Sequence, residues 1–151
     1  FSTPGEKEKK QALQIMREIG IEELADMECS ALSGGQFRMV MIARALVSDP
    51  YILVMDEAET HLDIRRQRDL LKLIKKLTKE RGIICLFNTH YPEHALKYAD
   101  QVLFLGKKRY RYGKTEEMMT EENLREFLDV KACLIDLKVF GYQEKMIYIT
   151  D

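Results

Sequence analysis

The 151-residue sequence lacks the features that mark several large classes of protein. Its three cysteines are far apart and form no C-x-x-C pair, which indicates that Cys29, Cys85 and Cys133 are reduced thiols of a cytosolic protein. No apolar run approaches the roughly 20 residues of a transmembrane helix, and the polar, charged start does not resemble a signal peptide. A net charge of -1 gives no sign of a strongly basic face. We therefore expect no direct membrane span and no nucleic-acid partner.

The composition fits one folded domain with its own core, because 46% of the residues are hydrophobic and 32% are charged. Apolar residues recur at helical spacing before Gly20, which predicts a first helix that ends there. A second helix is predicted from Ser33 to Ser48. This helix is apolar on most sides, so we expect it to be well buried.

The middle of the chain has the pattern of a β-α-β unit. The apolar runs Tyr51–Met55 and Ile83–Phe87 predict two strands, and the charged stretch Asp63–Arg81 predicts the helix between them. Because such crossovers are right-handed and return to the same sheet, the strands should lie parallel. Their unbroken apolar character predicts that both faces of the sheet are covered.

The last third of the chain mixes short helices and strands. The pattern predicts helices at 92–99 and 121–129, strands at 102–105 and 109–112, and a terminal hairpin made of 132–140 and 145–150. The fold class is therefore α/β, with a helical part, a partial parallel sheet and a C-terminal β-hairpin.

The segment Leu32-Ser33-Gly34-Gly35-Gln36 is the sharpest local signal. Ser33 and Gln36 have the spacing of a capping box, in which each side chain bonds the backbone of the other residue. The two glycines leave backbone N–H groups exposed at the start of a helix, where the helix dipole favours an anion. The alternative interpretation is an ordinary Gly-containing loop before a well-capped helix.

Acidic residues and a histidine follow the two predicted strands. Asp56 and Glu57 come directly after the first strand, and His90 lies just past the second. Ligands of open α/β sheets bind beyond the carboxyl ends of the strands, where an Asp can hold hydrated Mg²⁺ and a Glu can deprotonate water. The alternatives are a solvated acidic turn and a surface histidine.

Taken in this order, these signals resemble the ABC ATPase family. Leu32–Gln36 matches its LSGGQ signature, Ile52–Glu57 resembles its Walker B segment, Leu62-Asp63 resembles the end of its D-loop, and Thr89-His90 resembles its switch histidine. Ala58-Glu59 departs from the usual Pro-Thr or Pro-Ser, and Phe37 replaces a common Arg. The resemblance implies a P-loop NTPase-like fold and three segments. These are a helical signature subdomain at 1–49, a partial ATPase core at 50–130 and a hairpin at 131–151.

The resemblance also implies roles for individual residues. ATP and Mg²⁺ would be the ligands, and a second ATPase subunit would complete a dimer. In that dimer the signature residues Ser33, Gly34, Gly35 and Gln36 would bind the γ-phosphate of ATP held by the opposite subunit. Asp56 would hold Mg²⁺ through water, Glu57 would be the catalytic base, His90 would sense the γ-phosphate, and Asp63 would lie at the dimer interface.

A phosphate-binding P-loop, G-x-x-x-x-G-K-[ST], is missing from the sequence. The partial match Gly113-Lys114-Thr115 lacks the first glycine, since position 108 is Lys108, and we interpret it as a turn. The chain opens with Phe1, and the resemblance implies that it starts after the family's P-loop and Q-loop. We therefore expect this chain to be the C-terminal part of an ATPase subunit and to be inactive alone. We also expect its sheet to have an exposed edge, which favours self-association.

Weaker similarities concern the type of ABC protein. His90–Leu96 and Thr120–Leu124 are similar to importer subunits for iron-chelate, haem and cobalamin compounds. This similarity implies a membrane permease as partner, and a cytoplasmic protein held at the inner face of the cell membrane. Two alternatives stay open: a soluble ABC ATPase acting on DNA or ribosomes, and a non-catalytic half-cassette that serves as an interaction module.

Overall fold

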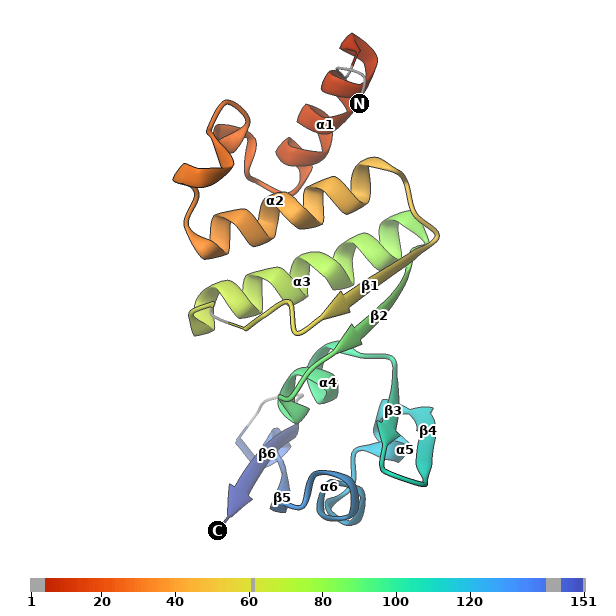
Figure 1. The fold of residues 1–151 in the computed structure, drawn as a ribbon. Coiled ribbons are helices and arrows are strands. Elements are labelled where there is room, and N and C mark those ends of the chain that lie inside the picture. Colours follow the sequence, from red (N-terminus) through yellow and green to blue (C-terminus); the bar gives the residue numbers. More distant parts are fainter. Residues whose placement is uncertain (1–4, 61, 141–144, 151) are drawn as a thin grey trace. The chain divides into compact units, whose positions relative to one another are not determined.

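A computed structural model describes residues 5–60, 62–140 and 145–150 (Figure 1). The chain divides into two compact units, one up to Asn88 and one from Thr89 onward, and each is described by itself. The three functional segments expected from the sequence are a different division and stay a prediction.

Three helices form the bulk of the first unit. They are α1 (Glu6–Glu18), α2 (Gly34–Val47) and α3 (Ile64–Arg81), with short 3₁₀ turns at Glu22–Leu24 and Cys29–Ala31. The Asp63 side chain caps α3 by accepting a hydrogen bond from the Arg66 N–H at 2.9 Å. Gly82 ends α3 in the left-handed conformation, φ 66°, which glycine adopts without a steric cost. Both ends of α3 thus follow from the local sequence.

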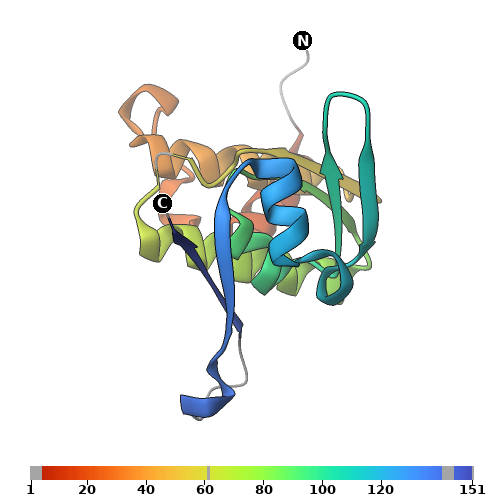
Figure 2. The same ribbon diagram turned by 90° about the horizontal axis from the view of Figure 1, so that it is seen from below.

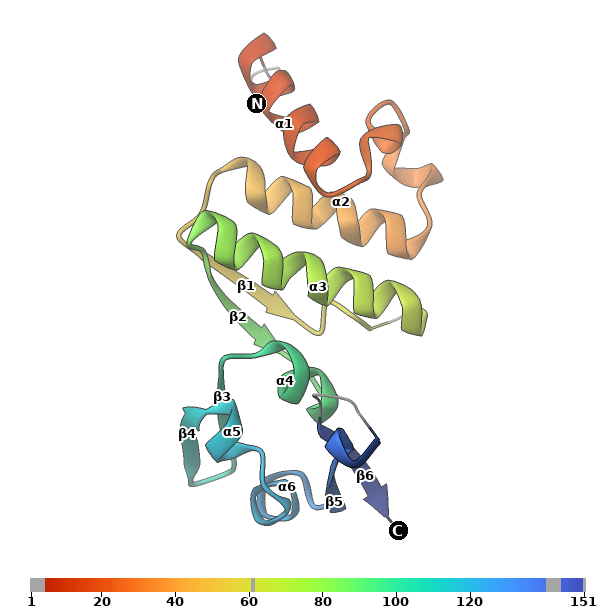
Figure 3. The same ribbon diagram turned by 180° about the vertical axis from the view of Figure 1, so that it is seen from behind.

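The strands β1 (Ile52–Asp56) and β2 (Ile84–Asn88) pair in parallel, with Ile52 opposite Ile84 and Asp56 opposite Asn88. This pairing confirms the predicted β-α-β unit. Figure 3 shows α3 running along one face of the two strands. The buried core of the unit lies there and combines Leu53 of β1 with side chains from the helices, including Leu46, Leu70 and Leu77.

The prediction that both faces of this sheet are covered is wrong. Ile52 and Val54 of β1 are 54% and 69% exposed, and Ile84 and Leu86 of β2 are 62% and 57% exposed. Alternate side chains of a strand point to opposite faces, and the described part of the chain covers only one of them. An unbroken apolar run therefore does not by itself tell whether a second face is covered.

The second unit is built from two antiparallel hairpins and short helices (Figure 2). Its core is made of Val102, Phe104, Met119, Leu124 and Ala132. The terminal hairpin confirms the prediction from the sequence. The elements are α4 (Pro92–Tyr98), β3 (Gln101–Leu105), β4 (Tyr110–Lys114), α5 (Thr115–Met118), α6 (Glu121–Leu128), β5 (Lys131–Asp136), a 3₁₀ turn (Leu137–Phe140) and β6 (Lys145–Thr150).

The segment Gly113-Lys114-Thr115 is not the turn that the sequence suggested. Gly113 and Lys114 end strand β4, and Thr115 begins α5. Thr115 is buried, and its hydroxyl donates to the Ala99 carbonyl oxygen at 2.7 Å. This bond uses the Thr115 hydroxyl to tie α5 to the end of α4. In the described ranges, no helix is both long and apolar enough to cross a bilayer.

Candidate functional site

The Gly-containing turn before α2 has the geometry that its sequence predicts. The Ser33 hydroxyl accepts from the Gln36 N–H at 3.3 Å, and the Gln36 amide oxygen accepts from the Ser33 N–H at 2.9 Å. This reciprocal capping box fixes the first turn of α2. Ser33 and Gly34 are exposed, so the start of the helix is accessible to an anion.

The two glycines of this turn differ in what surrounds them. A Cβ on Gly34 would meet nothing within 4 Å. A Cβ on Gly35 would lie 3.0 Å from Nη1 of Arg66 and 3.1 Å from Cδ2 of Leu62. A side chain at position 35 would therefore push the ends of the Arg66 and Leu62 side chains aside by a few tenths of an ångström, whereas position 34 has room for a side chain or a ligand.

Asp56 is the last residue of β1, and its carboxylate is held by a neighbour on β2. The Asn88 side-chain amide donates to Oδ1 of Asp56 at 2.7 Å, and the two residues face each other in the strand register. The sequence analysis missed Asn88. Its position at the end of β2, opposite Asp56 in the parallel pair, was the signal that could have identified it.

Glu57 follows Asp56 in an uncommon backbone conformation. Its φ of 44° lies in the left-handed region, which non-glycine residues rarely adopt. The Glu57 N–H donates to the Asn88 carbonyl oxygen at 3.0 Å. The Glu57 carbonyl oxygen accepts from the Thr60 N–H at 3.1 Å, from the Thr60 hydroxyl at 2.7 Å and from Nη1 of Arg38 at 2.7 Å. Hydrogen bonds thus hold both the N–H and the carbonyl group of Glu57, the residue that carries the carboxylate.

The segment after Glu57 is packed into the unit. Ala58 is 8% exposed and Glu59 is fully buried, so the departure at Ala58-Glu59 lies inside the fold, whereas the departure at Phe37 is 45% exposed. The side-chain amide of Gln67 donates to the carbonyl oxygens of Glu59 at 3.3 Å and Leu62 at 3.1 Å, which ties this segment to α3. Asp63 remains exposed at the start of α3, in an ion pair with Arg66 at 3.4 Å.

His90 belongs to the second unit, where it is exposed and precedes α4 in the sequence. Its expected place on one edge with Asp56 and Glu57 stays a prediction. The residues that the first unit does bring together are Asp56, Glu57, Asn88, Arg38 and Thr60. The sequence analysis identified only the two acidic residues of this set.

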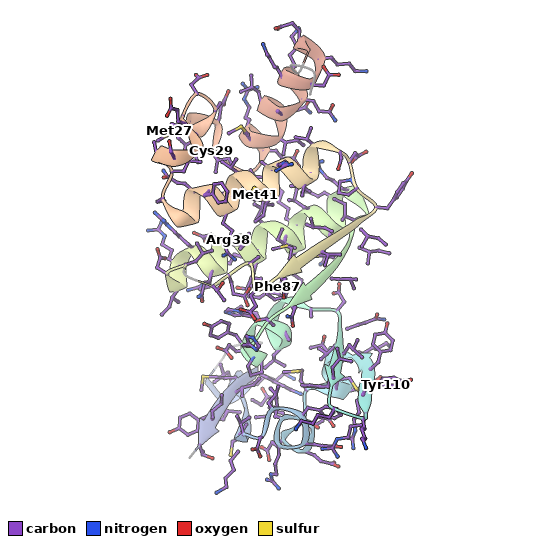
Figure 4. All side chains as sticks on the ribbon, viewed as in Figure 1. Met27, Cys29, Arg38, Met41, Phe87 and Tyr110 are labelled. Atoms are coloured by element: carbon purple, nitrogen blue, oxygen red, sulfur yellow. The ribbon has the colours of Figure 1, made fainter. Side chains whose placement is uncertain are left out.

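A groove of about 500 Å³ lies between α2 and β1, beside this cluster. Arg38, Asp56 and Thr60 supply its polar lining. Apolar side chains, including Phe37, Met41 and Leu53, supply most of the rest. Figure 4 shows Arg38 extending from α2 on the side of β1 and α3.

The donor set at the end of β1 fits Mg²⁺ only if other ligands complete the shell. Asp56 offers an exposed carboxylate, a hard oxygen ligand, and the described residues contain no group of three or more His, Cys, Asp or Glu side chains placed to hold a metal ion together. Mg²⁺ in proteins is commonly held by one or two carboxylates, with water and substrate phosphates filling the remaining positions. The arrangement therefore suits a magnesium ion that arrives with a phosphate compound.

Comparison with known proteins shows which family this chain resembles. The family model described as "ABC transporter" matches residues 2–60, a range that includes the turn before α2 and both acidic residues. The molybdate import ATP-binding protein MolC of Haemophilus influenzae is 32% identical over 124 residues, which cover 82% of this chain and 49% of the relative. The phosphonates import ATP-binding protein PhnC of Lactiplantibacillus plantarum is 38% identical over 112 residues, covering 74% and 44%. The chain spans about half the length of these curated relatives.

Solved structures show the same similarity. One described as an inward-facing conformation of a metal-chelate type ABC transporter aligns with a TM-score of 0.87 and 26% identity, over 99% of this chain and 60% of the other. The structure of cbiO1 from Clostridium perfringens, part of the ABC transporter complex cbiONQ, aligns with a TM-score of 0.71 and 28% identity, over 85% and 52%.

Proposed function

The chain belongs to the ABC transporter family of ATP-binding proteins, and we propose that it forms the signature and Walker B part of an ATPase subunit that drives solute import. The observation that carries the proposal is the combination of two features in one compact unit. These are an accessible, capped LSGGQ turn at the start of α2 and the pair Asp56–Glu57 at the carboxyl end of β1.

The signature turn is proposed to bind phosphate across a dimer. Ser33, Gly34, Gly35 and Gln36 would contact the γ-phosphate of an ATP molecule held by a second subunit. The exposed backbone N–H groups and the positive end of the α2 dipole would stabilise its negative charge. Asp63, exposed at the start of α3, would lie at the interface between the two subunits.

The two acidic residues are proposed to divide the chemistry of hydrolysis. When bound, Mg²⁺ supplies positive charge that offsets the negative charge of the phosphates. Asp56, oriented by Asn88, would hold this ion through water. Glu57 would accept a proton from the attacking water, and His90 would contact the γ-phosphate.

We propose that these 151 residues do not hydrolyse ATP by themselves. Gripping the β- and γ-phosphates requires a G-x-x-x-x-G-K-[ST] loop, and this sequence has none. The signature turn offers one anion site, and Asp56 offers one metal ligand. A subunit or segment that carries the missing loop is therefore needed for turnover.

The proposed partner is a membrane permease, with the chain at the cytoplasmic face of the membrane. The named relatives belong to import systems for molybdate and phosphonates, and others at 36% identity to systems for spermidine and putrescine. We propose a metal chelate as the solute, supported by the structural similarity over 99% of the chain. These relatives favour import over the alternative of an ATPase acting on DNA or ribosomes.

The test compares ATP hydrolysis by the isolated chain with hydrolysis by an assembly that contains a P-loop-bearing ATPase subunit. We expect no turnover by the chain alone, and turnover in the assembly that Glu57→Gln lowers at least about 100-fold because the base is lost. Glu23→Gln, an exposed acid in the first 3₁₀ turn, serves as the matched control and should have no effect. Hydrolysis by the isolated chain, or full activity of Glu57→Gln, would contradict the proposal.

A further inference from the structure

The side chain of Arg38 connects the signature helix α2 to the backbone of the proposed catalytic base. Arg38 lies in the second turn of α2, and its Nη1 donates to the Glu57 carbonyl oxygen at 2.7 Å across 19 residues of sequence. We infer that Arg38 is a positioning residue that fixes the backbone of Glu57 and thereby the direction of its carboxylate. This inference rests on the proposed role of Glu57 as the base.

The backbone of Glu57 needs such support. At φ 44° the Cβ of a non-glycine residue is crowded against its own backbone, so this conformation persists only where surrounding contacts hold it. A relaxed φ at position 57 would rotate the Cα–Cβ bond and move the carboxylate away from its present direction. The conformation of one residue therefore determines where the proposed base points.

Hydrogen bonds reach the backbone of Glu57 from two parts of the unit, and those with Asn88 and Thr60 are local to the end of the sheet. Asn88 accepts from its N–H, while the N–H and hydroxyl of Thr60 donate to its carbonyl oxygen from the following turn. The bond from Arg38 comes from a different helix and carries a full positive charge, which makes it stronger than a neutral bond. Arg38 is half-buried, so water competes with this bond less than at the surface.

The position of Arg38 in α2 gives this bond a second consequence. α2 begins with the turn that we propose binds the γ-phosphate, and Arg38 follows Ser33 by five residues on the same rigid helix. A phosphate that draws the start of α2 towards it also acts, through Arg38, on the backbone that carries Glu57. The hydrogen bond from Arg38 thus links phosphate binding at the signature turn to the backbone geometry of Glu57 within one chain.

The first test is native-state hydrogen exchange of the chain, measured by NMR at the amides of Glu57 and Thr60. Both amides donate in the hydrogen bonds that hold this turn, so their exchange reports its opening. Arg38→Ala removes a hydrogen bond from a charged donor, and we expect exchange at both amides to become about 10-fold faster or more. Arg44→Ala, at an exposed arginine on the same helix, is the control and should leave both rates unchanged.

A second variant keeps the test decisive if Arg38→Ala fails to fold. Thr60→Val removes a neutral donor to the same oxygen, and we expect faster exchange at Glu57 by a smaller factor. Arg38→Lys retains a cation but not the planar guanidinium, so it should restore part of the protection. Unchanged exchange at Glu57 in Arg38→Lys and in every folded Arg38 variant would overturn the inference, whatever the ATPase activity.

The second test uses the ATP-hydrolysing assembly. A base that is misdirected but present should lower kcat while the KM for ATP stays unchanged, with partial recovery in Arg38→Lys. Faster exchange together with an unchanged kcat would overturn the role of Arg38 in catalysis. If the wild-type assembly hydrolyses no ATP, the proposed function fails, and the exchange rates still decide whether Arg38 holds Glu57.

Discussion

The two faces of the β1–β2 sheet are alike in sequence and opposite in environment. Leu53 on the covered face is 6% exposed, whereas Leu86 on the other face is 57% exposed. Both are leucines in five-residue parallel strands, and both belong to unbroken apolar runs. The difference arises because α2 and α3 pack against one face only, while the described residues leave the other open.

This comparison shows where the stability of the first unit originates. The covered face joins β1 to the helices that carry the signature turn and Asp63, so packing on that face holds the proposed site together. The open face contributes apolar surface without partners from the described part of the chain, and such a surface favours association. The same strands thus stabilise the fold through one face and expose an apolar surface that favours association on the other.

The largest expected effect comes from truncating one leucine on each face. Leu53→Ala should lower the free energy of unfolding by about 2–5 kcal/mol, because it removes a buried side chain and leaves a cavity. Leu86→Ala is the matched control and should change it by no more than about 0.5 kcal/mol. Urea unfolding followed by circular dichroism measures both. Equal losses from the two variants would show that the faces do not differ in solution.

The helices and strands could be predicted from the sequence, but which faces of the strands are buried could not. Helix α3 was predictable because Asp63 and Gly82 mark its ends chemically, and the parallel pairing follows from the β-α-β connection. The exposure of Val54 and Leu86 was not predictable, since an apolar run has the same letters whether one face is covered or two. Burial is a property of the contacts between elements, and those contacts are not local in sequence.

In the candidate site, too, local features could be predicted from the sequence and long-range contacts could not. Its capping box could be predicted because Ser33 and Gln36 interact within one turn. Arg38 and Asn88 could not be singled out, because their roles depend on which backbone or carboxylate lies opposite them in the folded chain. The left-handed backbone of Glu57 likewise has no local sequence signal, as glutamate has no preference for it.

The second prediction uses a cysteine on the covered side of β2. Burial raises the pKa of the Cys85 thiol to about 11, because the thiolate would lose its hydration there. At pH 8 we expect iodoacetamide to modify Cys85 at least about 10-fold more slowly than the exposed Cys29 and Cys133, since the thiolate is the nucleophile. Mass spectrometry of timed samples measures the three rates.

The same shift predicts how stability depends on pH. The pKa is higher in the folded state, so the unfolded chain loses the Cys85 proton first. The protonated Cys85 thiol contributes to the free energy of unfolding. This contribution is complete below about pH 9 and is lost as the pH rises towards 11. Cys85→Ser should remove that part of the alkaline loss. Equal modification of all three cysteines in the native chain would show that the covered face opens readily.

The smallest expected effect concerns association through the open face. We expect the chain to self-associate weakly at high concentration, because the open face presents apolar side chains and the two strands have unpaired edges among the described residues. Val54→Lys places a charge in the middle of that face and should lower the weight-average mass in sedimentation runs at increasing concentration. Leu13→Lys adds the same charge at an exposed apolar position on α1 and should leave the mass unchanged, so it separates an effect of the face from an effect of net charge. A wild-type chain that stays monomeric at every concentration would show that this face, although apolar, is not adhesive, and the contrast between the two faces would then concern stability alone.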